Sequence, residues 1–423
     1  MSNAKTPRHV KRSVPEYGNP VTKFGCGLVF DLFDKPGTDN VVVSPYSIWT
    51  ALAMAENATD PHSVAGIQMK HMLQHDRVGD GLVDQWYIDT KKDIEKENKK
   101  VVISSGNAIF TTNPNLDPAC VYNANAIFAS GVFKLTGRED INSFVSDHTE
   151  KMIPKLLTED PDGPTILINA VYFKAQWTKK FDPLYTRDGF FHPFGRDRWM
   201  VGRNDRNPCK MMNMDKDMVY GETPKFQMIK LDYGDKDTDE FSAFIALPNR
   251  GNPSENNDQT LVNDTARYMF SVGSPDNWVE LFNMRHRKVN LLMPRFEVSG
   301  GVDNLKDYMQ KNGVSELFKP GGLINMALCP DDCIYDVIHH AVIRVDEEGT
   351  TAAAATAVVA TRGMPPPSTV VRVDRPFIFA VIHNPTKTLI FVARVNSVCV
   401  MQRCRLGVTD AGWVQQMQAG CTR

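Results

Sequence analysis

One stretch of the chain constrains its fold more than any other, the run TILINAVYF at residues 165–173. It carries no charge, and apart from its threonine and Asn169 it is apolar or aromatic. A strand with one solvent-facing side alternates apolar and polar residues, whereas a strand buried on both faces reads as an almost continuous apolar run. We therefore predict a central strand here, with other structure packed on both of its sides.

Helix and strand signals alternate along the rest of the chain. Ser44 followed by Pro45 predicts a helix start, because serine caps free N–H groups and proline fits the first turn. The other segments with a helix or strand pattern are helices at 21–33 and 141–157, strands at 41–43 and 101–110, and strand-rich stretches at 225–250, 288–298 and 369–396. The fold is therefore expected to mix helices with strands.

No internal repeat and no Gly/Ser-rich or Pro-rich linker divides the chain. We predict a single domain over residues 18–398, preceded by a flexible polar segment at 1–17. Residues 399–423 form an extension that carries three of the eight cysteines. The sequence does not decide whether this extension is disordered or forms a cap held by disulfides.

The charge balance argues against some partners. The 423 residues contain 48 Lys and Arg against 50 Asp and Glu, a net charge of −2. Because proteins that bind nucleic acid or an anionic membrane surface need excess cations, we expect neither partner. No apolar run approaches the ~18 residues that cross a bilayer. The expected protein is a monomer that does not insert into membranes.

The compartment is predicted from two signals. The first twenty residues lack the apolar core of a signal peptide. Two Asn-X-Ser/Thr sequons, at Asn57 and Asn263, tilt the prediction toward an extracellular or cell-surface location rather than the cytoplasm.

A segment without charge lies near the C-terminus. Between Glu348 and Arg362 there is one Gly, six Ala and six β-branched residues. The alanines favour a helix, whereas the valines and threonines favour a strand. Small uncharged side chains can also enter a closed sheet at little desolvation cost. The two interpretations can hold in turn, with an exposed segment that later becomes a strand.

Arg362 is a lone cation in this neutral segment, and three prolines at 365–367 favour an extended backbone after it. An exposed, extended segment with one arginine suits a trypsin-like serine protease, whose specificity pocket is acidic. Small residues such as Val359 and Ala360 would instead suit an elastase-like enzyme.

Several motifs occur in the order and at the spacing of the serpin family, which the chain resembles over residues 21–398. They are NVVVSPYSI at 40–48, NAVYFKAQW at 169–177, EEGT with the alanine run at 347–355, DRPFIF at 374–379 and LIFVARV at 389–395. Each motif is weak alone, but together they are specific to this family.

The resemblance implies an α+β fold with three β-sheets, eight or nine helices and an exposed reactive-centre loop, here residues 347–375. It also implies suicide inhibition. The target protease cleaves the loop and forms a covalent acyl-enzyme, and the freed loop then inserts as a new strand of the main sheet. The chain would then be a protease inhibitor rather than an enzyme, with no required cofactor.

Site residues follow from the resemblance one position at a time. A hydrogen-bonded cluster where the sheet opens would consist of Ser44, Ser47, Asn169 and His339. At the top of the sheet, Glu347 would pair with Arg295 near Trp177. The hinge of the loop would comprise Glu347, Glu348, Gly349, Thr350, Thr351, Ala352, Ala353, Ala354 and Ala355.

The reactive bond is predicted to join Arg362 and Gly363. The family's usual count from Glu347 ends on Gly363, but a loop one residue shorter ends on Arg362. We prefer Arg362 because a cation offers a specificity pocket much more than glycine does.

Other classes fit the sequence less well. No His-Glu-X-X-His, Gly-X-Ser-X-Gly or Walker motif occurs, which argues against a hydrolase. The spacing of Cys329 and Cys333 with His339 and His340 fits no common zinc site, so we expect no metal. A non-inhibitory serpin that acts as a binding, carrier or chaperone protein is the main alternative. Its hinge would tend to carry charged, bulky or proline residues, which this hinge lacks.

The lysine-rich segment KKDIEKENKK at residues 91–100 leaves a glycosaminoglycan site open. Three acidic residues interleave with its lysines and dilute the positive field. A solvated helix face is therefore the simpler interpretation.

Overall fold

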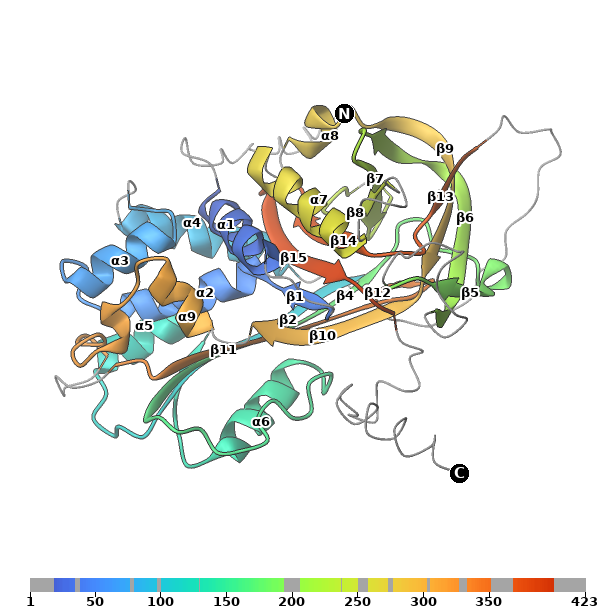
Figure 1. The fold of residues 1–423 in the computed structure, drawn as a ribbon. Helices are drawn as coiled ribbons and strands as arrows, with labels where there is room; N and C mark the ends of the chain where they lie inside the picture. Colours follow the sequence, from blue (N-terminus) through green and yellow to red (C-terminus); the bar gives the residue numbers. More distant parts are fainter. Residues whose placement is uncertain are drawn as a thin grey trace, which may run out of the picture.

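The computed structural model describes residues 19–34, 39–76, 80–96, 100–128, 130–193, 206–236, 238–249, 258–272, 277–302, 305–326, 333–350 and 368–398. In Figure 1, helices α1–α5 and α9 gather at one end of the molecule and most strands lie at the other. Helix α6 stands apart and covers the outer side of a sheet. Within the described ranges no helix is long and apolar enough to cross a membrane.

The described ranges contain nine α-helices. They are Pro20–Asp34 (α1), Pro45–Asn57 (α2), Val64–Met72 (α3), Asp80–Ile94 (α4), Pro118–Phe128 (α5), Arg138–His148 (α6), Asp258–Val272 (α7), Trp278–Leu281 (α8) and Leu305–Lys311 (α9), with 3₁₀ turns at Pro183–Tyr185 (η1) and Glu316–Phe318 (η2). Helix α2 starts as predicted, because the Ser44 hydroxyl accepts a hydrogen bond of 3.2 Å from the Ser47 N–H.

A six-stranded sheet, here called the main sheet, has the predicted central strand in its interior. Its strands in order are Phe296–Val302 (β10), Asp336–Val345 (β11), Thr165–Gln176 (β4), Val101–Thr111 (β2) and Gly131–Lys134 (β3), with Gly349–Thr350 (β12) also paired to β4. Strand β4 runs antiparallel to β2 and parallel to β11. The prediction of a central strand at 165–173 is therefore confirmed.

The remaining strands form a nine-stranded sheet. They are Val41–Val43 (β1), Thr388–Val395 (β15), Phe377–His383 (β14), Phe241–Pro248 (β8), Phe226–Tyr233 (β7), Asn207–Glu222 (β6), Arg285–Pro294 (β9) and Thr369–Arg372 (β13), with Arg187–Phe191 (β5) on a second edge of β6. The long β6 pairs with β5 at its start and with β7 at its end. Two of the three expected sheets are therefore joined into one, because both contain β6.

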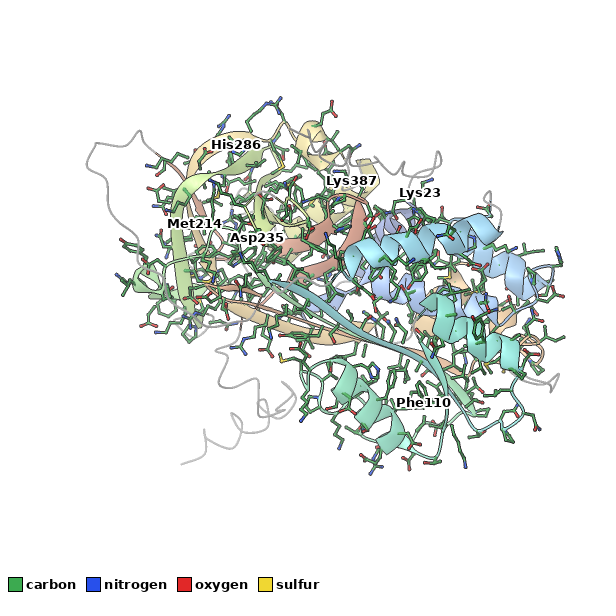
Figure 2. All side chains as sticks on the ribbon, turned by 180° about the vertical axis from the view of Figure 1, so that it is seen from behind. Lys23, Phe110, Met214, Asp235, His286 and Lys387 are labelled. Carbon is green, nitrogen blue, oxygen red and sulfur yellow. The ribbon has the colours of Figure 1, made fainter. Side chains whose placement is uncertain are left out.

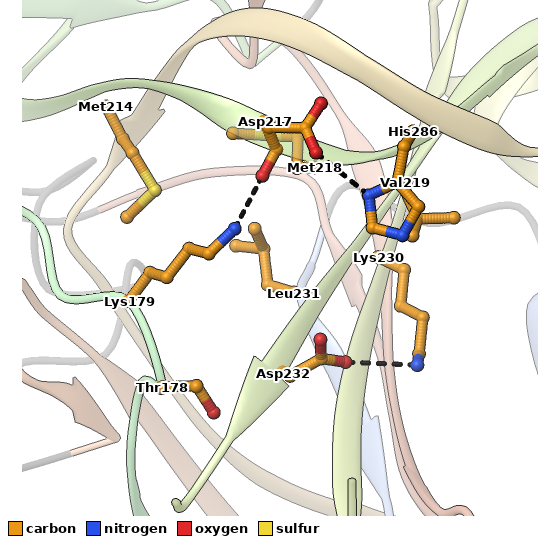
Figure 3. Close-up of a pocket in the computed structure, with 10 residues that line it drawn as sticks. All are labelled: Thr178, Lys179, Met214, Asp217, Met218, Val219, Lys230, Leu231, Asp232 and His286. Atoms are coloured by element: carbon orange, nitrogen blue, oxygen red, sulfur yellow. Dashed lines mark hydrogen bonds and ion pairs between the residues drawn. The ribbon is translucent and has the colours of Figure 1, made fainter. Parts of the chain in front are cut away.

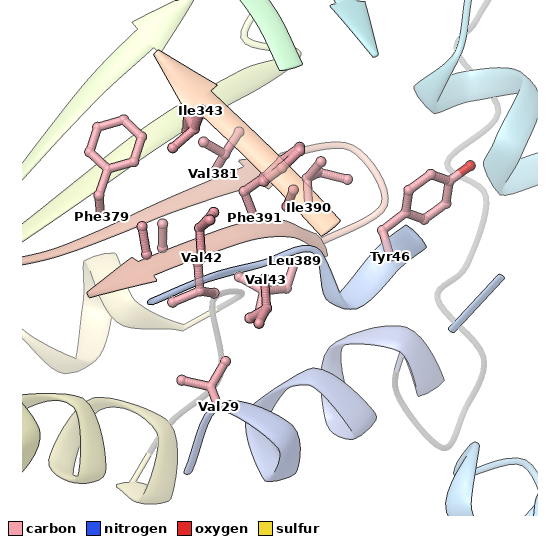
Figure 4. Packing of buried hydrophobic residues seen from close by; sticks show 14 of the residues in the cluster. Val29, Val42, Val43, Tyr46, Ile343, Phe379, Val381, Leu389, Ile390 and Phe391 are labelled. Carbon is pink, nitrogen blue, oxygen red and sulfur yellow. The ribbon is translucent and has the colours of Figure 1, made fainter. Parts of the chain in front are cut away.

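The main sheet separates two hydrophobic cores. Leu167, Val171 and Phe173 of β4 belong to the large core, which Figure 4 shows around β1, β15 and α2. The alternate residues of β4 belong to a smaller core beneath α6, together with Phe110 of β2, which Figure 2 labels from behind. Because successive side chains of a strand point to opposite faces, burial of both faces explains the unbroken apolar run.

The helix predicted at 141–157 is shorter in the structure, where α6 ends at His148. Glu150 and Lys151 adopt φ angles of 49° and 61°, in the left-handed region that interrupts a right-handed helix. The chain then folds back onto α6, where the Asn142 side-chain oxygen accepts hydrogen bonds of 2.8 Å from the N–H groups of Leu156 and Leu157. Three-dimensional packing therefore overrides the local helix pattern after His148.

Candidate functional site

The four residues predicted for the sheet-opening cluster meet at the centre of the main sheet. Asn169 of β4 and His339 of β11 are register partners, and His339 Nδ1 is hydrogen-bonded to Asn169 Oδ1. The Ser44 N–H donates to His339 Nε2 over 3.3 Å. Asn169 Nδ2 donates to the carbonyl oxygen of Ser47 at 3.0 Å and to its hydroxyl at 2.5 Å. All four residues are buried.

Asn107 completes the cluster, and sequence reasoning missed it. It is the register partner of Asn169 on β2, and its side-chain oxygen accepts a hydrogen bond from Asn169 Nδ2. The available signal was a buried amide inside the predicted strand at 101–110. With Asn107 included, the cluster joins β2, β4 and β11 to the first turn of α2.

His339 is neutral in this arrangement. Burial, together with a smaller effect of the neighbouring His340, lowers the pKa of His339 to about 3. The hydrogen-bond network assigns the proton to Nδ1, because Nε2 accepts from a backbone N–H. Protonation of Nε2 would therefore break the bond to Ser44.

The predicted pair of Glu347 and Arg295 lies at the carboxyl end of β4. Arg295 donates to Glu347 Oε1 from Nε at 2.8 Å and from Nη2 at 2.6 Å, and the Thr186 hydroxyl donates to the same oxygen at 2.5 Å. Burial raises the pKa of Glu347, but the bonds from Arg295 and Thr186 outweigh it and leave the pKa below its ordinary value.

Trp177 clamps the backbone on either side of Glu347. Its indole N–H donates to the carbonyl oxygen of Asp346 at 3.0 Å, and its backbone N–H donates to that of Glu348 at 2.8 Å. The indole also stacks on Tyr233 with ring centroids 4.3 Å apart. Tyr233, unlike Trp177, was not predicted to belong to this site. Hydrogen bonds from Trp177 therefore hold the backbone at Asp346 and Glu348, where the hinge is predicted to start.

Strand β12 occupies a defined edge of β4. Gly349 pairs with Gln176 and Thr350 with Ala175, in antiparallel register. The other edge of Ala175 is taken by Val101 of β2. Each strand has only two edges, so β12 lies on the edge of β4 that β11 occupies lower down. Strand β11 pairs with β4 only up to Phe173, which leaves that edge open for β12.

Only glycine fits at position 349. Its φ is 141°, and an added Cβ would lie 2.0 Å from the Ala175 carbonyl oxygen. The remaining hinge residues, Thr351–Ala355, and the predicted reactive bond between Arg362 and Gly363 lie outside the described residues.

Three lysines of the lysine-rich segment have carboxylate partners. Lys91 bonds Glu95 at 2.7 Å, Lys96 lies 3.8 Å from Glu240, and Lys100 pairs with Asp235. These carboxylates reduce the field available to a polyanion. They favour the solvated-face interpretation over a glycosaminoglycan site.

Two other features of the sequence can be compared with the structure, a glycosylation sequon and a histidine considered for zinc. Asn263, one of the two sequon residues, accepts a hydrogen bond of 2.8 Å from buried Arg394 through its side-chain oxygen. The extracellular location stays a prediction. His339, considered for zinc, uses both ring nitrogens within the cluster. The described ranges contain no group of three or more potential metal ligands.

Comparison with known proteins tests the resemblance. The family model of Serpin (serine protease inhibitor) matches residues 19–398. The chain belongs to the serpin family. Leukocyte elastase inhibitor of Sus scrofa is similar to this serpin, with 30% identity over 390 residues, 89% of this chain and 98% of the relative.

Solved serpin structures share the fold. Serpin48 of the insect Tenebrio molitor has a TM-score of 0.73 at 22% identity, covering 90% of this chain and 97% of that one. Human thyroxine-binding globulin has a TM-score of 0.76 at 18% identity, covering 90% and 98%. The predicted serpin fold is confirmed. One of these neighbours is a thyroxine-binding globulin, so the fold alone does not fix the function.

Proposed function

We propose that this serpin inhibits trypsin-like serine proteases as a suicide substrate. The protease's serine oxygen attacks the Arg362 carbonyl carbon, the bond to Gly363 breaks, and the new amine of Gly363 takes a proton. An ester then joins the protease to Arg362 while the loop inserts between β4 and β11. The observation that carries this proposal is the position of β12, which already lies on the edge of β4 facing β11.

The register of β12 extends along β4 without conflict. If the antiparallel pairing continues from Thr350 and Ala175, Thr356 comes opposite Asn169 and Ala360 comes opposite Thr165, the first residue of β4. The ladders of β4 with β2 and with β11 contain no register shift. A regular strand of residues 349–360 therefore matches the whole length of β4.

The same register places small side chains against the large core. Paired residues of an antiparallel ladder share a face, so Thr350, Ala352 and Ala354 would face the core beside Ala175, Phe173 and Val171. None of them is charged, and none is larger than threonine. A strand of this composition can enter the sheet without burying an unpaired charge.

Insertion would rebuild the buried cluster. An inserted strand passes between Asn169 and His339 and breaks their direct hydrogen bond. The continued register brings the hydroxyl of Thr356 opposite Asn169, where it can donate one hydrogen bond and accept another. The cluster would therefore keep its polar groups satisfied in both states.

Incubation with trypsin followed by a denaturing gel tests the proposal. We expect a covalent band of summed mass, and a released C-terminal fragment that begins at Gly363. The control is Arg362→Ala, which should give no such band. A nick without a covalent band would support a carrier or chaperone role. A covalent band with elastase but not with trypsin would move the bond to Val359 or Ala360.

A further inference from the structure

A cavity of about 50 Å³ lies between β6, β7 and the segment that follows β4 (Figure 3). Its apolar lining comes from Met214, Met218, Val219 and Leu231. Lys179 and His286 also line it and are exposed residues, so the cavity reaches the surface. In Figure 2, Met214 and His286 both lie at the strand-rich end of the molecule.

The cavity gives access to a thioether that is otherwise shielded. Met214 is only 4% exposed, but it lines the cavity. In Figure 3 the side chains of Met214 and Lys179 extend into the same space. Met212 provides an internal comparison. It lies two residues earlier on the same face of β6, is fully buried, and does not line the cavity.

Lys179 lines the same cavity as this sulfur. Its ammonium group donates one hydrogen bond of 2.7 Å, to the Asp217 carbonyl oxygen. An ammonium carries three N–H donors, so two remain for a small molecule in the cavity. A cavity of this size has room for a few water-sized molecules, and hydrogen peroxide is close to water in size and polarity.

We propose that Met214 is a methionine oxidation site for hydrogen peroxide. The sulfur attacks one peroxide oxygen, the O–O bond breaks, and a sulfoxide forms as the sulfur loses two electrons. The departing hydroxide takes up the proton left by the transferred oxygen, so that peroxide is reduced to water. The Lys179 ammonium hydrogen-bonds the departing oxygen and stabilises the charge that develops on it. The sulfoxide is polar, which disfavours its burial against Leu231.

Fragment-ion mass spectrometry after graded peroxide treatment tests this site. The tryptic peptide of residues 211–216 contains both Met214 and Met212, so one spectrum compares them. In the native protein we expect Met214 to react at least tenfold faster than Met212, and in urea we expect equal rates. Equal rates in the native protein would overturn the proposal.

Two variants separate the parts of the proposal. Lys179→Gln keeps a side chain of similar length but removes the charge, and it should slow Met214 oxidation several-fold; an unchanged rate contradicts the role of Lys179. Peroxide should lower the melting temperature of the wild type by a few degrees. Met214→Leu, which roughly conserves volume, should abolish that loss. A persistent loss would assign the damage to another methionine and contradict the proposal.

Discussion

At the scale of single residues, the hydrogen bond between His339 and Asn169 requires a neutral imidazole. The pKa of His339 is about 3 in the folded protein because the ring is buried, against an ordinary value of 6.5. The unfolded chain therefore takes up a proton at a higher pH than the folded protein does. Stability that His339 contributes is complete above about pH 6.5 and falls as the pH drops toward 3.

His339→Gln tests this dependence. At pH 7.5 the variant should be destabilised by about 1–3 kcal/mol, because buried polar partners lose a hydrogen bond. Between pH 6.5 and 4 its stability should fall less steeply than that of the wild type, as measured by urea unfolding. His71→Gln is the control, since the His71 side chain is 75% exposed. Equal acid slopes for wild type and His339→Gln would contradict the buried neutral state.

Glu347 also loses its stabilising contribution as the pH falls, because its pKa too is lowered in the folded protein. Its pKa lies below the ordinary 4.5 of a glutamate, so the Arg295 pair is intact above that pH and is lost as the carboxyl protonates. We expect Glu347→Gln to cost about 1–3 kcal/mol at pH 7 and progressively less as the pH falls below 4.5. Glu316→Gln, which breaks an exposed pair with Lys319, should cost less than Glu347→Gln does at pH 7. A pH-independent cost at position 347 would argue against the ion pair.

Some of these residues could be predicted from the local sequence and others could not. Asn169 stands out because an amide within an apolar strand must find partners. The pairing of Glu347 with Arg295 came only from the family resemblance, because the two lie 52 positions apart in the chain. Asn107 was missed for a similar reason. Its position opposite Asn169 depends on the register of β2, and local sequence does not specify register between distant strands.

At the scale of elements, β12 distinguishes two neighbouring hinge positions. Thr350 pairs with fully buried Ala175. Paired residues of an antiparallel ladder share a face, so in the proposed inserted strand position 350 would lie on the side of the large core. In the continued register Thr351 would pair with Lys174, whose side chain is 37% exposed on the outer face. The two threonines therefore meet opposite environments once the loop is inserted.

Thr350→Arg and Thr351→Arg form a matched pair of variants. Thr350→Arg would bury an unpaired charge during insertion, which slows insertion and lets the protease hydrolyse the ester. We expect it to be cleaved as a substrate, with loss of most covalent complex. Thr351→Arg should retain most of the complex. Titration against trypsin measures both, and equal behaviour of the two variants would refute the register.

Elements with strong local signals were predicted well, and elements set by packing were not. The capped start of α2 and the run in β4 follow from a few adjacent residues. The early end of α6 depends on contacts of Asn142 with residues 14 and 15 positions away. The continuity of two sheets through β6 depends on which strand pairs with each half of a 16-residue strand. Neither is visible in local periodicity.

At the scale of the whole molecule, the main sheet would gain backbone hydrogen bonds if a further strand were inserted between β4 and β11. Strands β4 and β11 share eight parallel register pairs. Insertion of residues 349–360 replaces them with antiparallel ladders on both sides of the new strand. The gain is on the order of ten backbone hydrogen bonds, each contributing about 1 kcal/mol. The intact protein would then store free energy, and cleavage of the reactive loop would release it.

The melting temperature before and after cleavage of the reactive loop tests this claim most directly. Calorimetry of the intact protein and of the protein nicked after Arg362 gives both values. Spread over the unfolding entropy of a chain this size, the added hydrogen bonds should raise the melting temperature by on the order of 10 °C or more. A nicked protein that melts at or below the temperature of the intact one would contradict loop insertion.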